Sequence, residues 1–179
     1  MPEEREASRQ EDTMDAAMTD VEMKIRGLMM DPVTNMPIVV LKDVNSETVL
    51  PIWVGIYEAN AIALEIQKVA TPRPMTHDLL KNVLSGLDTH VHKIVVSELR
   101  DETFFAVIWL ERDGHVISID SRPSDALALA LRMDCPIFVS DDVLKASKAA
   151  SASSDRVSQE ELRKWLENLN DEDLGRYKM

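Results

Sequence analysis

The chain has 179 residues, of which 45% are hydrophobic and 29% charged, and its formal net charge is −12 at pH 7. This length suits one compact domain with a core. The acidic balance excludes a general coat for nucleic acids, so such a substrate would need local arginines or a bound metal. No apolar run is long enough to cross a bilayer, and no secretory signal opens the chain. The single cysteine, Cys135, can form no intrachain disulfide, so we expect a reduced, cytoplasmic protein without a membrane partner.

The first half of the chain predicts strands followed by helices. Residues 1–20 are polar and acidic and predict a disordered leader. Three segments rich in β-forming residues and bounded by turn residues are predicted strands: residues 21–30, 36–42 and 47–54. Residues 55–70 contain no proline and no internal glycine, and they predict a helix that ends at a Thr-Pro-Arg-Pro run. Thr76 is the predicted cap of a second helix over residues 77–87.

The second half predicts a similar order. Three more strands are expected: residues 90–99, 103–111 and 115–120. Asp113-Gly114 is a strong hairpin signal between the last two. A helix, a short strand and a helical turn complete this half: residues 125–134 with Ser124 as the cap, 136–140 and 141–147.

The C-terminal part reads as an appendage to the domain. Residues 149–157 have the small side chains of a linker. Residues 158–170 predict an amphipathic helix that opens with a capping box and leads into the tail at 171–179. The apolar face of this helix carries Leu162, Trp165, Leu166 and Leu169. We expect it to dock on the domain or on a partner subunit.

An internal repeat runs through the predicted domain. Residues 39–64 align with residues 106–131 at a constant shift of 67 positions, without a gap. Apolar strand positions and turns coincide, and Glu58 falls on Asp125. We interpret the chain as an α+β domain of duplicated strand–hairpin–helix units around central alanine-rich helices. The domain and its two halves are predicted as residues 21–148, 21–87 and 88–148.

Three motifs in this order resemble the bifunctional nuclease domain. They are LPIWVGIYEANAIALEI, RPMTHDLL and ISIDSRPSDALALALRMDCPIFVSDDVL, and the resemblance covers roughly residues 23–146. The tail LGRYKM is similar to the end of many bacterial members. The resemblance implies a compact, homo-oligomeric α+β domain with nuclease activity on DNA and RNA. It implies no agreed catalytic residues, so candidates must come from side-chain chemistry.

The first candidate site lies where a predicted strand meets a helix. Asp120 and Asp125 could hold a metal that activates water, together with Glu58 as the repeat mate of Asp125. Arg122 could bind and stabilise a phosphate, and a helix N-terminus favours anions. The alternative is structural, with helix-start acids and an Asp120–Arg122 ion pair.

The second candidate site is the start of the helix after the proline run. His77 could act as general acid or base, and Asp78 could orient it or ligate a metal beside it. Arg73 could bind substrate phosphate. The alternative is a capped helix start with a surface ion pair.

The leading hypothesis is a nuclease with low sequence selectivity for DNA and RNA, assisted by Mg²⁺ or Mn²⁺ and using no organic cofactor. The alternative is a non-catalytic binding or regulatory module that acts through protein partners or a small ligand. One observation separates the two. A cleft shared by the candidate residues of both sites would favour the enzyme, and separate ion pairs would favour the structural reading.

Overall fold

The structure of the chain is a computed structural model, and it describes residues 20–151, 164, 167 and 168. The predicted leader, apart from Asp20, and most of the predicted C-terminal helix lie outside the described residues. Within the described ranges, no helix combines the length and the apolar character needed to span a membrane.

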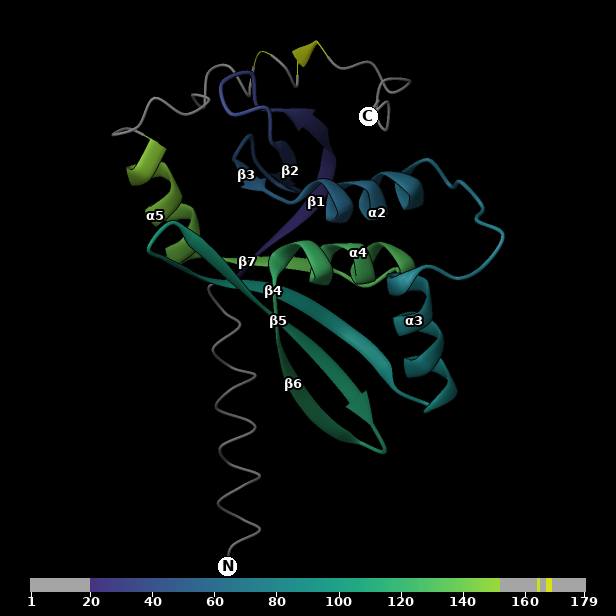
Figure 1. Cartoon of the computed structure of the whole chain (residues 1–179). Helices are drawn as coiled ribbons and strands as arrows, with labels where there is room; N and C mark the ends of the chain where they lie inside the picture. The colour runs from purple at the N-terminus through teal and green to yellow at the C-terminus, as the bar shows by residue number, and fades with distance from the viewer. Residues whose placement is uncertain (1–19, 152–163, 165–166, 169–179) are drawn as a thin grey trace, which may run out of the picture.

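A seven-stranded mixed sheet forms the centre of the molecule, in the order β3-β2-β1-β7-β4-β5-β6 (Figure 1). Its strands are β1 Asp20–Met30, β2 Pro37–Asp43, β3 Val49–Trp53, β4 His90–Arg100, β5 Thr103–Arg112, β6 His115–Ser121 and β7 Ile137–Ser140. Neighbouring strands are antiparallel, except that β4 and β7 are parallel. The helices are α2 Ile56–Ile66, α3 Thr76–Gly86, α4 Pro123–Met133 and α5 Asp141–Ser151. The predicted α+β class is confirmed.

Several helix ends differ from the predictions. Helix α2 stops at Ile66, because the next residues leave the helical conformation and Lys68 has a φ of 53°. The expected caps Thr76 and Ser124 lie inside their helices, and the N-cap residues are Met75 and Arg122. Helix α5 continues to Ser151 and so takes the first residues of the predicted linker.

The two halves share the same succession of elements, but their hairpins differ. Each half has a strand, a hairpin and a helix: β1, β2, β3 and α2, then β4, β5, β6 and α4. In the first hairpin Leu41 pairs with Leu50, whereas its repeat mate Ile108 pairs with Ile119 instead of Ile117. The ladder is therefore offset by two residues, because a tight Asp-Gly turn replaces a longer loop. The gap-free alignment does not hold across the hairpin, and the duplication stays a prediction.

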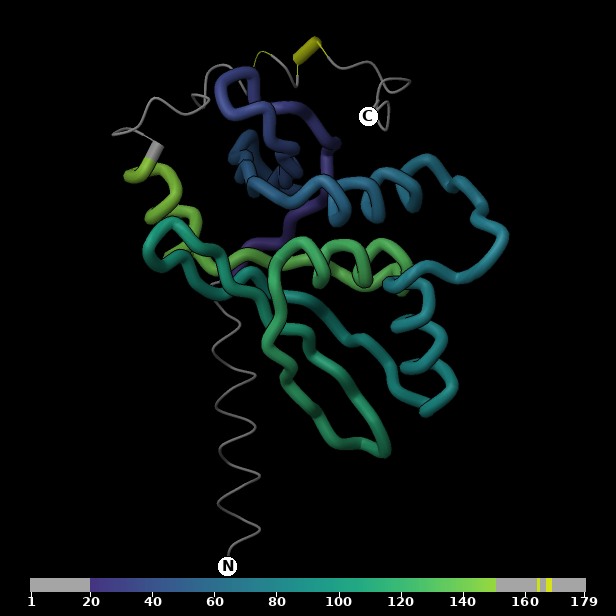
Figure 2. The backbone as a smooth tube through the Cα atoms, in the orientation of Figure 1, coloured from purple at the N-terminus to yellow at the C-terminus, as the bar shows by residue number. Residues whose placement is uncertain are grey.

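Helices α2 and α4 lie side by side over the sheet (Figure 2). Ala59 and Ala63 of α2 and Ala126 and Ala130 of α4 are buried in the main hydrophobic core. Because alanine side chains are small, the two helices can approach each other closely. This packing brings the N-terminal ends of both helices to the same side of the molecule.

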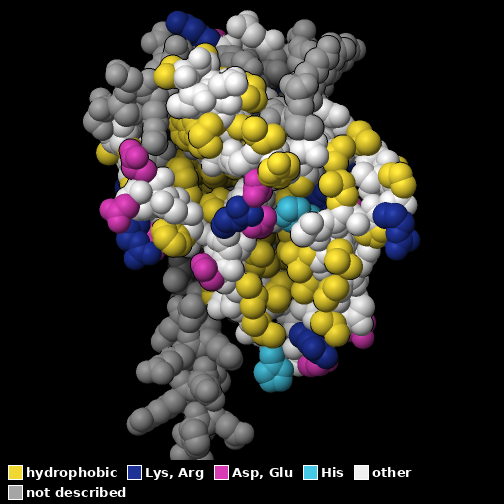
Figure 3. Space-filling model, in the orientation of Figure 1, with side chains coloured by type: hydrophobic (Ala, Val, Ile, Leu, Met, Phe, Trp, Pro, Cys, Tyr) yellow, Lys and Arg dark blue, Asp and Glu magenta, His cyan; other side chains and the backbone are white. Residues whose placement is uncertain are grey.

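Helix α3 contributes no buried side chain. It packs against α4 but leaves apolar side chains uncovered. Figure 3 shows apolar side chains gathered over α3 and the neighbouring strands. We call this surface the α3 apolar face, and it consists of Leu79, Leu80, Val83 and Leu87 of α3 with Ile117 and Ile119 of β6.

A buried carboxylate fixes the turn between β1 and β2. Asp31 is fully buried and accepts hydrogen bonds from the Val33 N–H at 2.9 Å, the Thr34 hydroxyl at 2.7 Å and Trp53 Nε1 at 2.8 Å. Burial raises the pKa of Asp31, but these hydrogen bonds outweigh it and hold the pKa below its ordinary value. The turn is thereby tied to the end of β3.

We predict that Asp31→Asn lowers the free energy of unfolding at pH 7 by about 1–3 kcal/mol, because buried donors lose a charged acceptor. Asp43 is the matched control, since it accepts from the Asn45 N–H and the Ser46 hydroxyl in an exposed turn. Asp43→Asn should cost about 0.5 kcal/mol. Both pKa values are lowered in the fold, so both contributions are lost as pH falls below about 4. Urea denaturation measures both, and equal costs would contradict the role of burial.

Candidate active site

Arg122 stands between two carboxylates at the start of α4. Its Nε donates to Asp125 Oδ2 at 2.8 Å, and its Nη2 lies 2.9 Å from Glu58 Oε1 on α2. The Arg122 side chain is 64% exposed, whereas the Glu58 side chain is 18% exposed. The predicted repeat mates Glu58 and Asp125 are thus brought together. The alternative Asp120–Arg122 ion pair does not form, because Arg122 pairs with these two acids.

Asp125 also holds His77, which comes from the first turn of α3. His77 Nε2 lies 2.9 Å from Asp125 Oδ1, and the His77 side chain is 12% exposed. Burial raises the pKa of Asp125, but the hydrogen bonds from Arg122 and His77 outweigh it and lower the pKa. An ionised carboxylate only accepts hydrogen bonds, so Nε2 carries a proton in this pair. In the neutral ring, Nδ1 is then the basic nitrogen.

The glycine at position 55 leaves space for the Glu58 carboxylate beside this cluster. A Cβ added to Gly55 would lie 2.1 Å from Glu58 Oε2, because the Glu58 carboxylate folds back over the start of α2. Gly55 is the N-cap residue of that helix and has an ordinary φ of −70°. The small residue therefore allows Glu58 to reach Arg122.

Asp78 does not hydrogen-bond His77, although the sequence places the two side by side. Its Oδ1 accepts from Arg132 Nε at 2.7 Å, and its Oδ2 accepts from the Met75 N–H at 2.9 Å. These bonds lower the pKa of Asp78, with Arg132 as the largest cause. Asp78 therefore caps α3, as the structural alternative expects, but its ion pair is with the buried Arg132 and not a surface pair at Arg73.

Arg132 is the residue that the sequence interpretation missed. Its side chain is 5% exposed, and besides Asp78 it donates to the carbonyl oxygens of Ala128 at 2.9 Å and Ala61 at 3.0 Å. An arginine near the end of a helix is usually read as a favourable partner of the helix dipole. The available signal was its place in an alanine- and leucine-rich run with no polar neighbours except the terminal Asp134.

Asp120 and Arg73 stay outside the cluster. Asp120 lies exposed on β6 opposite Val107, and Arg73 lies exposed in the loop before α3. Neither side chain makes an ion pair with a described residue. The predicted metal ligands Asp120, Asp125 and Glu58 are therefore not gathered. Within the described ranges, no group of three or more histidine, cysteine or acidic residues is placed to hold a metal ion.

Removing the buried guanidinium should destabilise the fold strongly. We predict that Arg132→Leu lowers the free energy of unfolding by about 3–5 kcal/mol, because the Asp78 carboxylate loses its cationic partner and two helix carbonyl groups lose their side-chain donor. Lys145→Leu, which breaks the exposed pair with Asp141, should cost about 0–1 kcal/mol. Urea denaturation at pH 7 compares the two variants, and a loss below about 1 kcal/mol for Arg132→Leu would contradict this role.

Comparison with known proteins agrees with the resemblance of the motifs. The sequence model described as "Bifunctional nuclease domain" matches residues 39–152. An uncharacterized protein of Mycobacterium tuberculosis is 34% identical over 155 residues, which cover 83% of this chain and 93% of that protein. The rice (Oryza sativa subsp. japonica) protein named Bifunctional nuclease 2 is 30% identical, over 58% of this chain and 33% of its own length. The rice protein named Bifunctional nuclease 1 is 26% identical, over 57% of this chain and 32% of its own length. The chain therefore belongs to the bifunctional nuclease domain family.

Proposed function

We propose that this chain is a cytoplasmic nuclease that cleaves phosphodiester bonds in DNA and RNA with low sequence selectivity. The observation that carries the proposal is the hydrogen bond of 2.9 Å between His77 and Asp125, whose second oxygen is held by Arg122. A histidine oriented by a carboxylate, with an arginine beside it, supplies a base and a phosphate-binding group in one place. Membership of the family supports the choice of nucleic acid as substrate.

His77 acts as the general base in this mechanism. Asp125 keeps the proton on Nε2, so Nδ1 is free to take a proton from an attacking water. The water oxygen bonds to phosphorus, the ester P–O bond breaks, and the leaving oxygen takes a proton from solvent. The imidazolium that forms is stabilised by the Asp125 carboxylate, which stays ionised because its pKa is lowered.

Arg122 binds the reacting phosphate. Its Nε and Nη2 are held by Asp125 and Glu58, so the guanidinium is already in place before substrate arrives. The exposed part of the group remains available to phosphate oxygens. The two acids offset its charge, so long-range attraction of nucleic acid is weak and a divalent cation carried by the phosphate would help. Mg²⁺ or Mn²⁺ would bind through the phosphate of the substrate, because the carboxylates of Glu58 and Asp125 are already paired with Arg122.

We predict that His77→Asn reduces the cleavage rate by about 100-fold to 10,000-fold, because the base is lost. Asp125→Asn should reduce it by a similar factor, since an amide can present its N–H to the ring and favour the wrong tautomer. Cleavage of end-labelled single-stranded DNA and RNA, with and without Mg²⁺ or Mn²⁺, measures both variants.

His115→Asn is the matched control for this assay, because His115 is exposed on the β5–β6 hairpin and its Nδ1 lies 3.0 Å from the Asp113 carbonyl oxygen. Its cleavage rate should equal that of the wild type. A folded His77→Asn protein that cleaves as fast as the wild type would remove His77 from the mechanism. It would leave the non-catalytic binding module as the better description.

The proposal includes a homo-oligomer and a duplicated origin. The α3 apolar face is exposed on α3 and β6. A second copy of the chain would bury this face. The shared succession of elements, with Glu58 and Asp125 both three residues after an N-cap and meeting at Arg122, supports descent of the two halves from one unit.

We predict that the wild-type protein is oligomeric and that Val83→Glu makes it monomeric, because a charge would be buried at the interface. Val33→Glu is the matched control, since Val33 is exposed in the β1–β2 turn far along the chain from α3. Sedimentation velocity at micromolar concentration measures the state. A monomeric wild type, or an oligomer in the Val83→Glu protein, would contradict the assignment of this face.

A further inference from the structure

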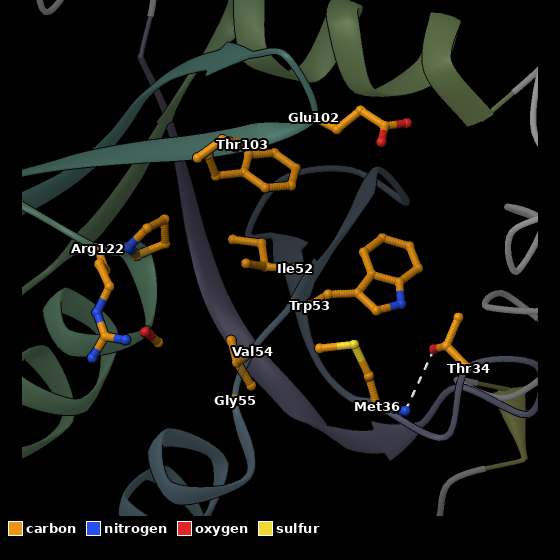
Figure 4. A pocket seen from close by; sticks show the side chains of 12 residues that line it. Thr34, Met36, Ile52, Trp53, Val54, Gly55, Glu102, Thr103 and Arg122 are labelled. Atoms are coloured by element: carbon orange, nitrogen blue, oxygen red, sulfur yellow. Dashed lines mark hydrogen bonds between the residues drawn. The ribbon is translucent and has the colours of Figure 1, made fainter.

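A cavity of about 380 Å³ lies beside Arg122, between the end of β3, the β4–β5 turn and the start of α4 (Figure 4). None of its lining residues is His77 or Asp125. One end is bordered by the N-cap residues of two helices, Gly55 of α2 and Arg122 of α4. Its volume falls within the range of small-molecule sites. The cavity therefore adjoins the candidate active site and shares Arg122 with it.

The helix end of the cavity offers hydrogen-bond donors. Neither α2 nor α4 has a side-chain cap, so N–H groups of their first turns lack intrahelical partners. The positive ends of both helix dipoles face the same place as the Arg122 guanidinium. The N–H groups at the helix ends favour an anion, whereas the charge of Arg122 is already offset by Glu58 and Asp125.

A buried serine gives an independent sign of a ligand. Ser124 lines the cavity and is 7% exposed, and its hydroxyl makes no hydrogen bond to any described residue. It is not sealed from the cavity, because no fully enclosed polar side-chain atom is left without a partner in the described part of the chain. Because the hydroxyl is accessible from the cavity and has no partner among the described residues, a group that enters the cavity can hydrogen-bond to it.

Apolar and aromatic side chains form part of the remaining wall, beside Thr34, Glu102 and Thr103. Ile52, Trp53 and Phe104 line it, and the indole of Trp53 is anchored by its hydrogen bond to the buried Asp31. Aromatic side chains of this kind stack on nucleobases. Figure 4 shows Arg122 and Glu102 on opposite sides of the pocket, with Ile52 and Trp53 between them. A ligand with one anionic end and an amino-bearing ring at the other matches this polarity.

We propose that the cavity binds one nucleoside monophosphate unit, with its phosphate at Arg122 and Ser124 and its base against Trp53 and Phe104. The inference rests on the proposed function for the identity of the ligand. It deepens that function, because a nucleotide held here lies next to the bond that His77 would hydrolyse. Binding of one nucleotide through its phosphate and a stacked base is also compatible with low sequence selectivity.

Calorimetric titration with AMP, adenosine and inorganic phosphate tests the proposal. AMP should bind the wild type at least about ten-fold more tightly than either half-ligand, since it engages both ends of the cavity. Ser124→Ala should weaken the affinity for AMP by about ten-fold or more, because a hydrogen bond to the charged phosphate is lost. Its melting temperature should not fall, since the hydroxyl has no partner to lose. Ser118→Ala, at an exposed position of β6, is the matched control and should bind AMP normally.

A second variant tests the apolar end. Phe104→Leu should weaken the binding of AMP and of adenosine while leaving the affinity for inorganic phosphate unchanged, because only the stacking surface is removed. Equal affinity for AMP and phosphate would overturn the base site. Normal AMP binding by Ser124→Ala would overturn the phosphate end, and no AMP binding by the wild type at millimolar concentration would overturn the whole inference.

The two proposals fail separately. His77→Asn should bind AMP as the wild type does, although it should not cleave nucleic acid, because His77 does not line the cavity. A wild-type protein that cleaves nucleic acid without binding AMP keeps the proposed function and ends this inference. A protein that binds AMP but does not cleave keeps the cavity assignment and ends the proposed function.

Discussion

The guanidinium of Arg132 joins three helices that the chain order alone would not place together. It belongs to α4, reaches the Ala61 carbonyl of α2, and pairs with Asp78 of α3. Because its side chain is nearly fully buried, its charge and its donors depend on the Asp78 carboxylate and the carbonyl oxygens of Ala61 and Ala128, among the described residues. The relative positions of the helices are therefore restricted. Since His77 precedes Asp78 on α3, the same contact brings the imidazole to the start of α4.

The charges at the candidate active site form an alternating chain on this framework. Glu58, Arg122 and Asp125 alternate in charge, and His77 ends the chain with its hydrogen bond to Asp125. Such an arrangement holds every side chain in one orientation before substrate binds, which is the condition for electrostatic catalysis. The guanidinium is held by two protein acids, while its exposed part stays in contact with solvent. A phosphate that binds at Arg122 meets side chains that are already held in place by these contacts.

Local patterns in the sequence were sufficient for the elements, because β-rich segments, proline runs and Asp-Gly turns act over a few residues. They placed Glu58, His77, Arg122 and Asp125 at helix starts. They did not pair them, because His77 and Asp125 are 48 residues apart and meet only through the packing of α3 on α4. The neighbour Asp78 was an attractive partner for His77, yet adjacent residues on a helix point in different directions. Sequence adjacency was the wrong guide at this point.

The remaining differences have similar causes. Arg132 was missed because burial of a charged side chain depends on partners from two other helices. The hairpin offset was missed because matching letters do not report how many residues a turn consumes. Asp120 was grouped with Arg122 by closeness along the chain, whereas the strand ends before the helix begins and leaves it on the exposed surface of β6.

The glycine at the start of α2 has a consequence for which sequences this fold can accept. Both α2 and α4 carry an acid three residues after the N-cap, but the sizes are exchanged: glycine with glutamate in α2, arginine with aspartate in α4. At Gly55 the long acid occupies the space that a side chain would need. A larger residue at position 55 would therefore push the Glu58 carboxylate away from Arg122, so positions 55 and 58 should influence each other during evolution. One helix start supplies the cation and the other leaves room for its counterion, so neither helix could be exchanged for a copy of its counterpart.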